Sequence, residues 1–293
     1  MLRKLTFGLV LLLTGMVATV QSSSSHPARK EVDFVVLTIP KCGTGLINKF
    51  FELSTTKKKY GPPDWFKRYY PNQETNSFEV ENILTQKVVN EVFTHAKQNN
   101  LFLFSHFNFA KPFMRYIHKH PEWKCVIQIR DLRDACVSMI YWQESIINNA
   151  LGPNATFDDK LMYVICASET LHKDTVFNIK ASAERAVQLL DHPNVIVSRY
   201  EDLVGSQGGG DDKVQKQLII RLAKELSIPM TSKKVEHIAS ILWGNEEGPF
   251  KPTFREGQIY KWKELFKPAH KEAFKKHFGN LLIVLGYETD NNW

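Results

Sequence analysis

The chain has 293 residues, of which 43% are hydrophobic and 24% are charged, with a formal net charge of +7 and an isoelectric point near 9.1. These values are ordinary for a globular protein, and the basic excess suits an anionic ligand such as a nucleotide or a sulfated polymer. The sequence has no zinc-finger, basic-helix or RNA-binding signature, so we expect no nucleic-acid partner. The four cysteines have neither metal-ligand nor disulfide-framework spacing, and we expect no bound metal.

The N-terminal segment has the pattern of a targeting signal. Two basic residues precede an apolar run from Leu5 to Val20, and a serine-rich stretch follows. This run is longer than many signal-peptide cores and shorter than a membrane span of about 20 residues. The pattern predicts a signal peptide or an N-terminal signal anchor at residues 1–21, a linker at 22–31 and one domain at 32–293. We therefore expect the protein in the secretory pathway or attached to a membrane.

Strand and helix patterns alternate along the rest of the chain. Apolar, β-branched runs of strand length occur at 32–39, 101–105, 124–129 and 195–198. Apolar residues recur at helical spacing from 46, and then at 79–99, 133–147, 157–190, 214–226, 233–243 and 269–285. A glycine-rich stretch at 205–212 is predicted to be a mobile loop. This alternation predicts a three-layer α/β domain, with a central parallel β-sheet flanked by helices.

The segment after the first strand, TIPKCGTG at residues 38–45, is a candidate anion site. Free backbone N–H groups and the helix dipole converge where a strand leads into a helix. Gly43 and Gly45 allow a phosphate to approach the backbone, Thr44 offers a hydroxyl, and Lys41 adds a positive charge. In a Walker A loop the lysine follows the second glycine, whereas here it precedes both. The alternative is a plain turn with a solvated lysine.

A second candidate anion site follows the strand at 124–129. Arg130 ends this strand, and Ser138 lies about two turns into the next helix. Both could reach one phosphate at the carboxyl edge of the sheet, where open α/β sheets bind ligands. The alternative is that Arg130 pairs with Asp131 or Asp134 and that Ser138 bonds to its own helix.

These segments resemble the motifs of sulfotransferases that use 3′-phosphoadenosine 5′-phosphosulfate (PAPS). The family's first loop reads PKSGTTW, and residues 40–46 read PKCGTGL. The resemblance implies a P-loop-like nucleotide-binding sulfotransferase fold and transfer of a sulfuryl group from PAPS to a hydroxyl or amine by in-line displacement. It implies that Lys41 stabilises the leaving phosphate. The residues that it places at the 5′-phosphosulfate are Lys41, Cys42, Gly43, Thr44 and Gly45.

The resemblance extends to the second site and to later segments. Arg130, Asp134 and Ser138 match the order and spacing of the family's 3′-phosphate motif, with Asp134 expected as a structural brace. Tyr200 begins a YEDL segment, whose tyrosine contacts the nucleotide in the family.

Residues 254–257 and 261–263 resemble the family's RKG and DWK segments. This likeness implies that Arg255 and the backbone of Gly257 close over the 3′-phosphate. Glu256 replaces a lysine and is expected to point away from the phosphate, and Trp262 is expected in the core.

The sequence defines the acceptor-binding site less clearly than the nucleotide-binding site. His106 follows the strand at 101–105, and the resemblance implies that it is the general base, with a structural histidine as the alternative. Aromatic residues are candidates to line the acceptor pocket. These candidates are Phe107, Phe109, Phe113, Tyr141 and Trp142. The acceptor is expected to be a small alcohol or phenol, or a glycan.

Two alternative functions stay open. A P-loop-type nucleotide-dependent kinase would need the Walker A lysine that the loop lacks. A catalytically degenerate sulfotransferase-like binding protein stays an alternative because of departures from the family pattern. These departures are Cys42 for serine, Gly45 for threonine, Leu46 for an adenine-stacking tryptophan, and Glu256 for lysine.

Overall fold

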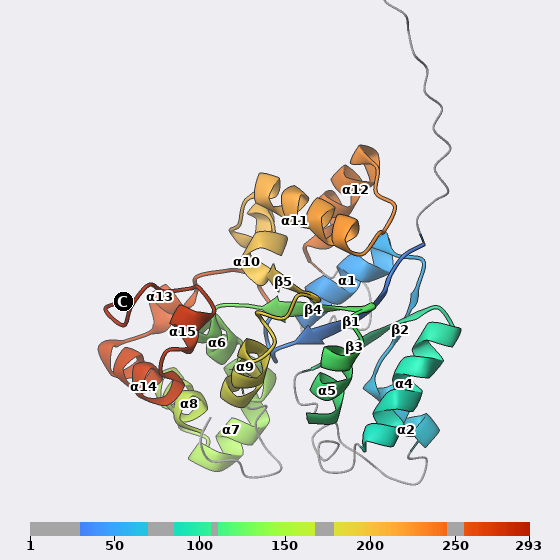
Figure 1. Cartoon of the computed structure of the whole chain (residues 1–293). Coiled ribbons are helices and arrows are strands. Elements are labelled where there is room, and N and C mark those ends of the chain that lie inside the picture. Colours follow the sequence, from blue (N-terminus) through green and yellow to red (C-terminus); the bar gives the residue numbers. More distant parts are fainter. Residues whose placement is uncertain (1–29, 70–84, 107–110, 168–178, 245–254) are drawn as a thin grey trace, which may run out of the picture.

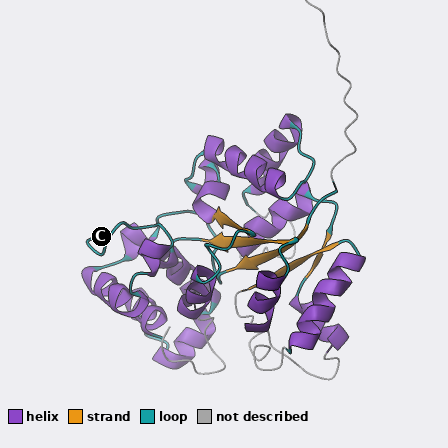
Figure 2. Ribbon diagram, viewed as in Figure 1, coloured by secondary structure: helices purple, strands orange, loops and turns teal. Residues whose placement is uncertain are grey.

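The structure is a computed structural model that describes residues 30–69, 85–106, 111–167, 179–244 and 255–293 (Figure 1). Within these ranges, parallel strands form one sheet in the order β2-β3-β1-β4-β5. The strands are β1 (Asp33–Thr38), β2 (Lys58–Tyr60), β3 (Leu101–His106), β4 (Trp123–Ile129) and β5 (Val195–Arg199). Helices cover both faces of the sheet (Figure 2), which confirms the predicted three-layer α/β fold.

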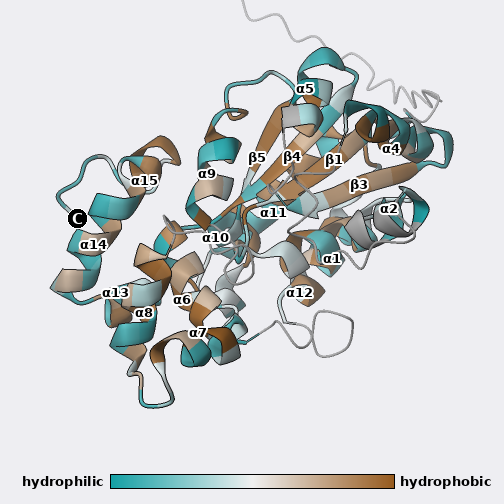
Figure 3. Cartoon of the chain, turned by 90° about the horizontal axis from the view of Figure 1, so that it is seen from below, coloured by the Kyte–Doolittle hydropathy of each residue, from teal (hydrophilic) through white to brown (hydrophobic). Residues whose placement is uncertain are grey.

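Side chains alternate along β1 and so divide the core into two clusters. Phe34 and Val36 pack with α1 (Thr44–Ser54), α11 (Asp212–Glu225) and α12 (Ser232–Leu242). Val35 and Leu37 pack on the opposite face. The helices of that face include α4 (Gln86–Gln98), α5 (Lys111–Lys119), α6 (Leu132–Trp142), α8 (Phe157–Cys166), α9 (Ile179–Val187) and α14 (Pro268–Phe278). Burial on both faces explains why the strands are nearly continuous apolar runs, which Figure 3 shows in brown.

Several predicted helices are shorter or interrupted. The helix predicted at 133–147 is two helices, because α6 ends at Trp142 and α7 (Glu144–Leu151) begins after Gln143. The helix predicted at 269–285 is also divided, since Gly279 has φ 54° between α14 and α15 (Leu281–Val284). Apolar spacing continues across both breaks, so periodicity alone did not reveal them.

Other elements are short or start later than predicted. Thr85 caps α4 by accepting a hydrogen bond from the backbone of Val88, and residues 70–84 lie outside the described residues. The predicted helix at 157–190 is described only at its two ends, as α8 and α9. The sequence patterns did not predict α5 or five short elements, which are β2, α2 (Pro62–Tyr69), α10 (Tyr200–Leu203), η1 (Ser206–Gly208) and α13 (Trp262–Leu265).

The glycine-rich stretch at 205–212 is packed against the domain, contrary to the predicted mobile loop. It forms η1, and the carbonyl of Gly208 accepts a hydrogen bond from the backbone of Ile259 at 3.1 Å. A Cβ atom at Gly208 would lie 2.8 Å from the carbonyl oxygen of Gly257. The glycines here allow two backbone segments to pack closely. A glycine-rich sequence alone does not distinguish such packing from a mobile loop.

The predicted targeting signal lies outside the described residues. The signal peptide or anchor predicted at 1–21, and the localisation that it implies, stay predictions. Within the described ranges, no helix combines the length and the apolarity needed to cross a bilayer.

Candidate active site

The loop between β1 and α1 is shaped to bind an anion. Lys41 and Gly43 have φ angles of 64° and 88°, and no side chain caps the N-terminus of α1. A Cβ atom at Gly43 would lie 2.2 Å from Cδ2 of Tyr200, so only glycine fits at this position. The first N–H groups of α1 are therefore open to a negatively charged group. Thr44 and Gly45 form this first turn.

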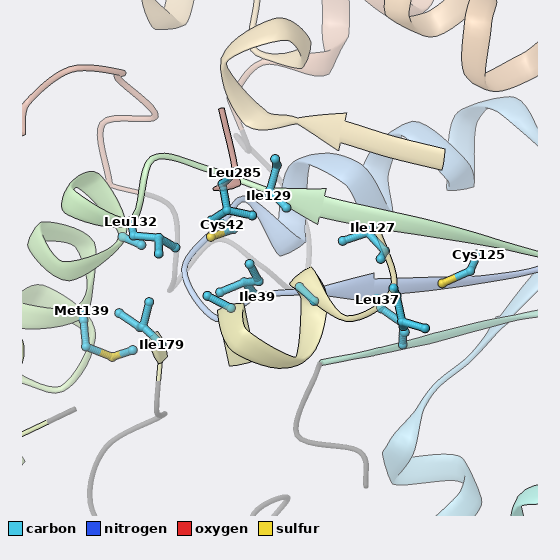
Figure 4. Packing of buried hydrophobic residues seen from close by; sticks show 14 of the residues in the cluster. Leu37, Ile39, Cys42, Cys125, Ile127, Ile129, Leu132, Met139, Ile179 and Leu285 are labelled. Atoms are coloured by element: carbon cyan, nitrogen blue, oxygen red, sulfur yellow. The ribbon is translucent and has the colours of Figure 1, made fainter. Parts of the chain in front are cut away.

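Cys42 supports the loop from the core side. Its side chain is fully buried in the same cluster as Ile39, Ile129 and Leu285 (Figure 4). Burial raises the pKa of the Cys42 thiol well above its usual range. The thiol is thus a neutral core group, and Cys42 could contact a phosphate only through its backbone.

Lys41 is half-buried at the carboxyl edge of the sheet. Burial lowers its pKa to about 8, and the positive charge of Arg130 acts in the same direction. The ammonium nitrogen lies 5.1 Å from the ring centroid of Trp142. The charges of Lys41 and Arg130 therefore lie close together at the carboxyl edge of the sheet. Because burial destabilises the Lys41 ammonium, binding of an anion at this edge would be favourable.

Arg130 joins the two predicted anion sites. Its guanidinium donates to the carbonyl oxygen of Lys41 at 3.4 Å and to that of Gln258 at 2.8 Å. Its Cζ atom lies 4.3 Å from the ring centroid of Tyr200. The side chain is buried, and its Nε atom has no hydrogen-bond partner among the described residues. An unsatisfied buried donor of this kind is costly unless a ligand accepts its hydrogen bond.

Asp134 is a brace and only a distant ion-pair partner of Arg130. Its carboxylate accepts hydrogen bonds from the backbone of Tyr260 at 2.7 Å and of Trp262 at 2.9 Å, whereas the nearest Arg130 nitrogen is 3.9 Å away. Trp262 is buried, as expected for a core residue. Asp134 thereby ties the segment at 257–262 to α6.

The remaining nucleotide-site candidates are spread more widely. Tyr200 is buried, and its hydroxyl donates to the carbonyl of Gly257 at 2.8 Å. Arg255 is exposed, lies over the Tyr141 ring at 3.9 Å from its centroid, and pairs with Glu256 at 2.5 Å.

Ser138 is half-buried on α6. The structure thus brings Arg130, Tyr200 and the Gly257 backbone together. Among the described contacts, none joins Ser138 or Arg255 to them.

His106 is linked to the phosphate loop through Thr38. The register of β1 and β3 sets Thr38 beside His106, and Thr38 Oγ1 lies 2.7 Å from His106 Nδ1 and 3.0 Å from Thr44 Oγ1. Burial lowers the pKa of His106 to about 4, and the charge of Lys41 contributes to this. The imidazole is therefore neutral near pH 7. Thr38 was not among the predicted site residues, although its place at the end of β1 was a signal.

The aromatic residues predicted to line the acceptor pocket lie in different environments. Phe107 and Phe109 lie outside the described residues. The prediction for Phe113 is wrong, because this ring is buried in the core against Trp65 and Phe93. Tyr141 and Trp142 are 43% and 39% exposed at the end of α6. Lys41 and Arg255 lie over these two rings, so aromatic surface borders the cationic edge.

A parallel sheet with an uncapped helix and clustered cations at its carboxyl edge defines an α/β protein that binds an anionic ligand. The family model described as "Sulfotransferase domain" matches residues 31–286. The chain therefore belongs to the sulfotransferase family, which confirms the sequence-based assignment and its enzyme class.

Comparison with known proteins also supports the fold. The crystal structure of mouse sulfotransferase SULT7A1 complexed with PAP is similar, with a TM-score of 0.57 and 14% sequence identity. The match covers 86% of this chain and 84% of the mouse chain. The search of curated proteins found no match to this sequence.

Proposed function

We propose that the protein transfers a sulfuryl group from PAPS to a hydroxyl or amine of a small alcohol, a phenol or a glycan. The observation that carries this proposal is the contact between Arg130 and the carbonyl of Lys41. It places the proposed 3′-phosphate arginine directly beside the loop proposed to hold the 5′-phosphosulfate. One nucleotide with phosphates at both ends could then occupy both sites. The mouse enzyme of similar fold was solved with PAP, adenosine 3′,5′-bisphosphate, which is what PAPS leaves after transfer.

The residues present fit such a nucleotide. The open N-terminus of α1, with Gly43, Thr44 and Gly45, would hold the 5′-phosphate. The unsatisfied Nε of Arg130 would donate to the 3′-phosphate. Ser138, Arg255 and the backbone of Gly257 are proposed to complete this site, with Tyr200 against the nucleotide.

Transfer requires positioning, charge stabilisation and removal of one proton. The acceptor oxygen or nitrogen would attack sulfur, and the bond from sulfur to the bridging oxygen of the 5′-phosphate would break. The Lys41 ammonium would stabilise the negative charge that develops on that oxygen. Neutral His106 would accept the proton of the acceptor, and Thr38 would orient its ring through Nδ1.

A pH profile tests the two proposed catalytic groups. Lys41 acts as a cation and His106 as a neutral base, so their lowered pKa values leave both active forms present between about pH 4 and about pH 8. We expect kcat/KM for PAPS to be level near neutral pH and to fall above about pH 8. In Lys41→Arg the alkaline fall should move to higher pH, because arginine stays charged. An alkaline limb at the same pH in that variant would assign it to another group.

Nucleotide binding distinguishes the proposal from its alternatives. We expect PAP to bind at least about tenfold more tightly than ATP in calorimetric titrations, since an Arg–phosphate contact to the 3′-phosphate is available only to PAP. A preference for ATP would support the kinase alternative. PAP binding without turnover on a panel of phenols, alcohols, amines and oligosaccharides would support the degenerate binding protein.

A further inference from the structure

We infer that Arg133, held in the corner between the perpendicular indoles of Trp262 and Trp293, is a positioning residue that holds the 257–262 segment against Arg130 and so sets the affinity for the 3′-phosphate. This inference rests on the proposed function, because it concerns the same phosphate site. It adds a support that lies outside the motifs of that site.

The Arg133 clamp consists of Arg133, Trp262, Trp293, Asp131 and Glu288. The Cζ atom of Arg133 lies 3.5 Å from the ring centroid of Trp262 and 4.4 Å from that of Trp293. The guanidinium donates to the Asp131 carboxylate at 2.9 and 2.7 Å and forms an ion pair with Glu288 at 2.6 Å. Only 2% of the Arg133 side chain is exposed. The clamp therefore joins the start of α6, α13 and the segment at 286–293, which lie together in Figure 1.

The segment that the clamp holds also contacts the nucleotide-site side chains. At the C-terminal end of the segment, the backbone of Trp262 donates to the carboxylate of Asp134. At its N-terminal end, the carbonyl of Gln258 accepts a hydrogen bond from Arg130, and that of Gly257 accepts one from Tyr200, each at 2.8 Å. A displacement of this segment would remove the shortest hydrogen bond of Arg130. The clamp thus acts on the phosphate site through Arg130 rather than by direct contact.

The clamp is also anchored to the strand ends that carry the site. Glu201, which follows β5, accepts from the hydroxyl of Tyr287 at 2.8 Å and from the backbone of Asp131 at 2.9 Å. Arg199 donates to the carbonyl of Leu285 at 2.8 Å. A buried arginine is costly unless its charge is paired, and apolar packing alone would not need one. The two indole rings, whose planes are 84° apart, and the two carboxylates fix an orientation that a hydrophobic contact would leave loose.

The test compares PAP with adenosine 5′-monophosphate, which lacks the 3′-phosphate. Calorimetric titrations of the full chain should show PAP binding weakened about tenfold in Trp293→Ala, because one of the two desolvated cation–π contacts of Arg133 is lost. Binding of adenosine 5′-monophosphate should change less than about twofold. Trp293→Phe, which keeps an aromatic face, should retain most of the PAP affinity.

Phe274→Leu is the matched control. Phe274 packs against Trp293 with ring centroids 5.9 Å apart, but it does not belong to the clamp. This variant should lower the thermal unfolding temperature and leave the ratio of the two affinities unchanged. If Trp293→Ala does not fold, Glu288→Gln removes the half-buried ion pair instead and should lower the same ratio about threefold.

The outcomes separate this inference from the proposed function. Wild-type protein that binds PAP no more tightly than adenosine 5′-monophosphate would contradict the proposed 3′-phosphate site itself. Wild-type discrimination that persists unchanged in folded Trp293→Ala, or in Glu288→Gln where that variant is used, would overturn the positioning role. Equal weakening of both ligands would overturn it too, since it would indicate a general loss of structure.

Discussion

Lys41→Met is expected to lower kcat by roughly 10²–10³-fold or more, while the fold is retained. Lys41 is the ammonium at the loop, half-buried beside Trp142, and methionine keeps the length of the side chain without its charge. Charge that develops on the bridging oxygen would then lose its nearest proposed cation. Single-turnover transfer from labelled PAPS, with an acceptor taken from the panel, measures this step directly.

The affinity of Lys41→Met for PAP shows whether the substitution affects catalysis or nucleotide binding. Arg130 and the open N-terminus of α1 remain, so we expect PAP affinity to fall by only about tenfold. Lys41→Arg is the control, because it keeps a positive charge with different geometry and should retain intermediate activity. Wild-type kcat in Lys41→Met would remove Lys41 from the mechanism.

The sheet was predictable because its strands are buried on both faces. Apolar, β-branched runs have few other stable arrangements, and four of the strands lie within two residues of their predicted bounds. By contrast, β2 is a three-residue edge strand with the sequence KKY, which carries no apolar pattern. The helix breaks at Gln143 and Gly279 were missed because the apolar spacing continues through them.

The candidate site was predictable where its chemistry lies in side-chain type and spacing. Lys41 and Arg130 were predicted from their positions at strand ends, and the structure brings them together because parallel strands end at one edge. Thr38 was missed because its role depends on register with His106. Gln258 was missed because it acts through its carbonyl, and any residue could supply that atom. Phe113 was misassigned because apolar aromatics serve cores and pockets alike.

His106→Gln is expected to lower kcat by roughly 10²–10⁴-fold, the range typical of losing a general base. Glutamine can keep a hydrogen bond to Thr38 but cannot accept the acceptor proton near pH 7. Because His106 has a pKa of about 4, the neutral base predominates at physiological pH, and any acid limb of the wild-type profile near pH 4 should vanish in the variant. Thr38→Val is the control, since it removes the side-chain contact to Nδ1 and leaves the imidazole in place. It should cost less, about tenfold, because orientation is loosened while the proton acceptor stays. An unchanged rate in folded His106→Gln would mean that another group takes the proton, with His106 then a structural partner of Thr38.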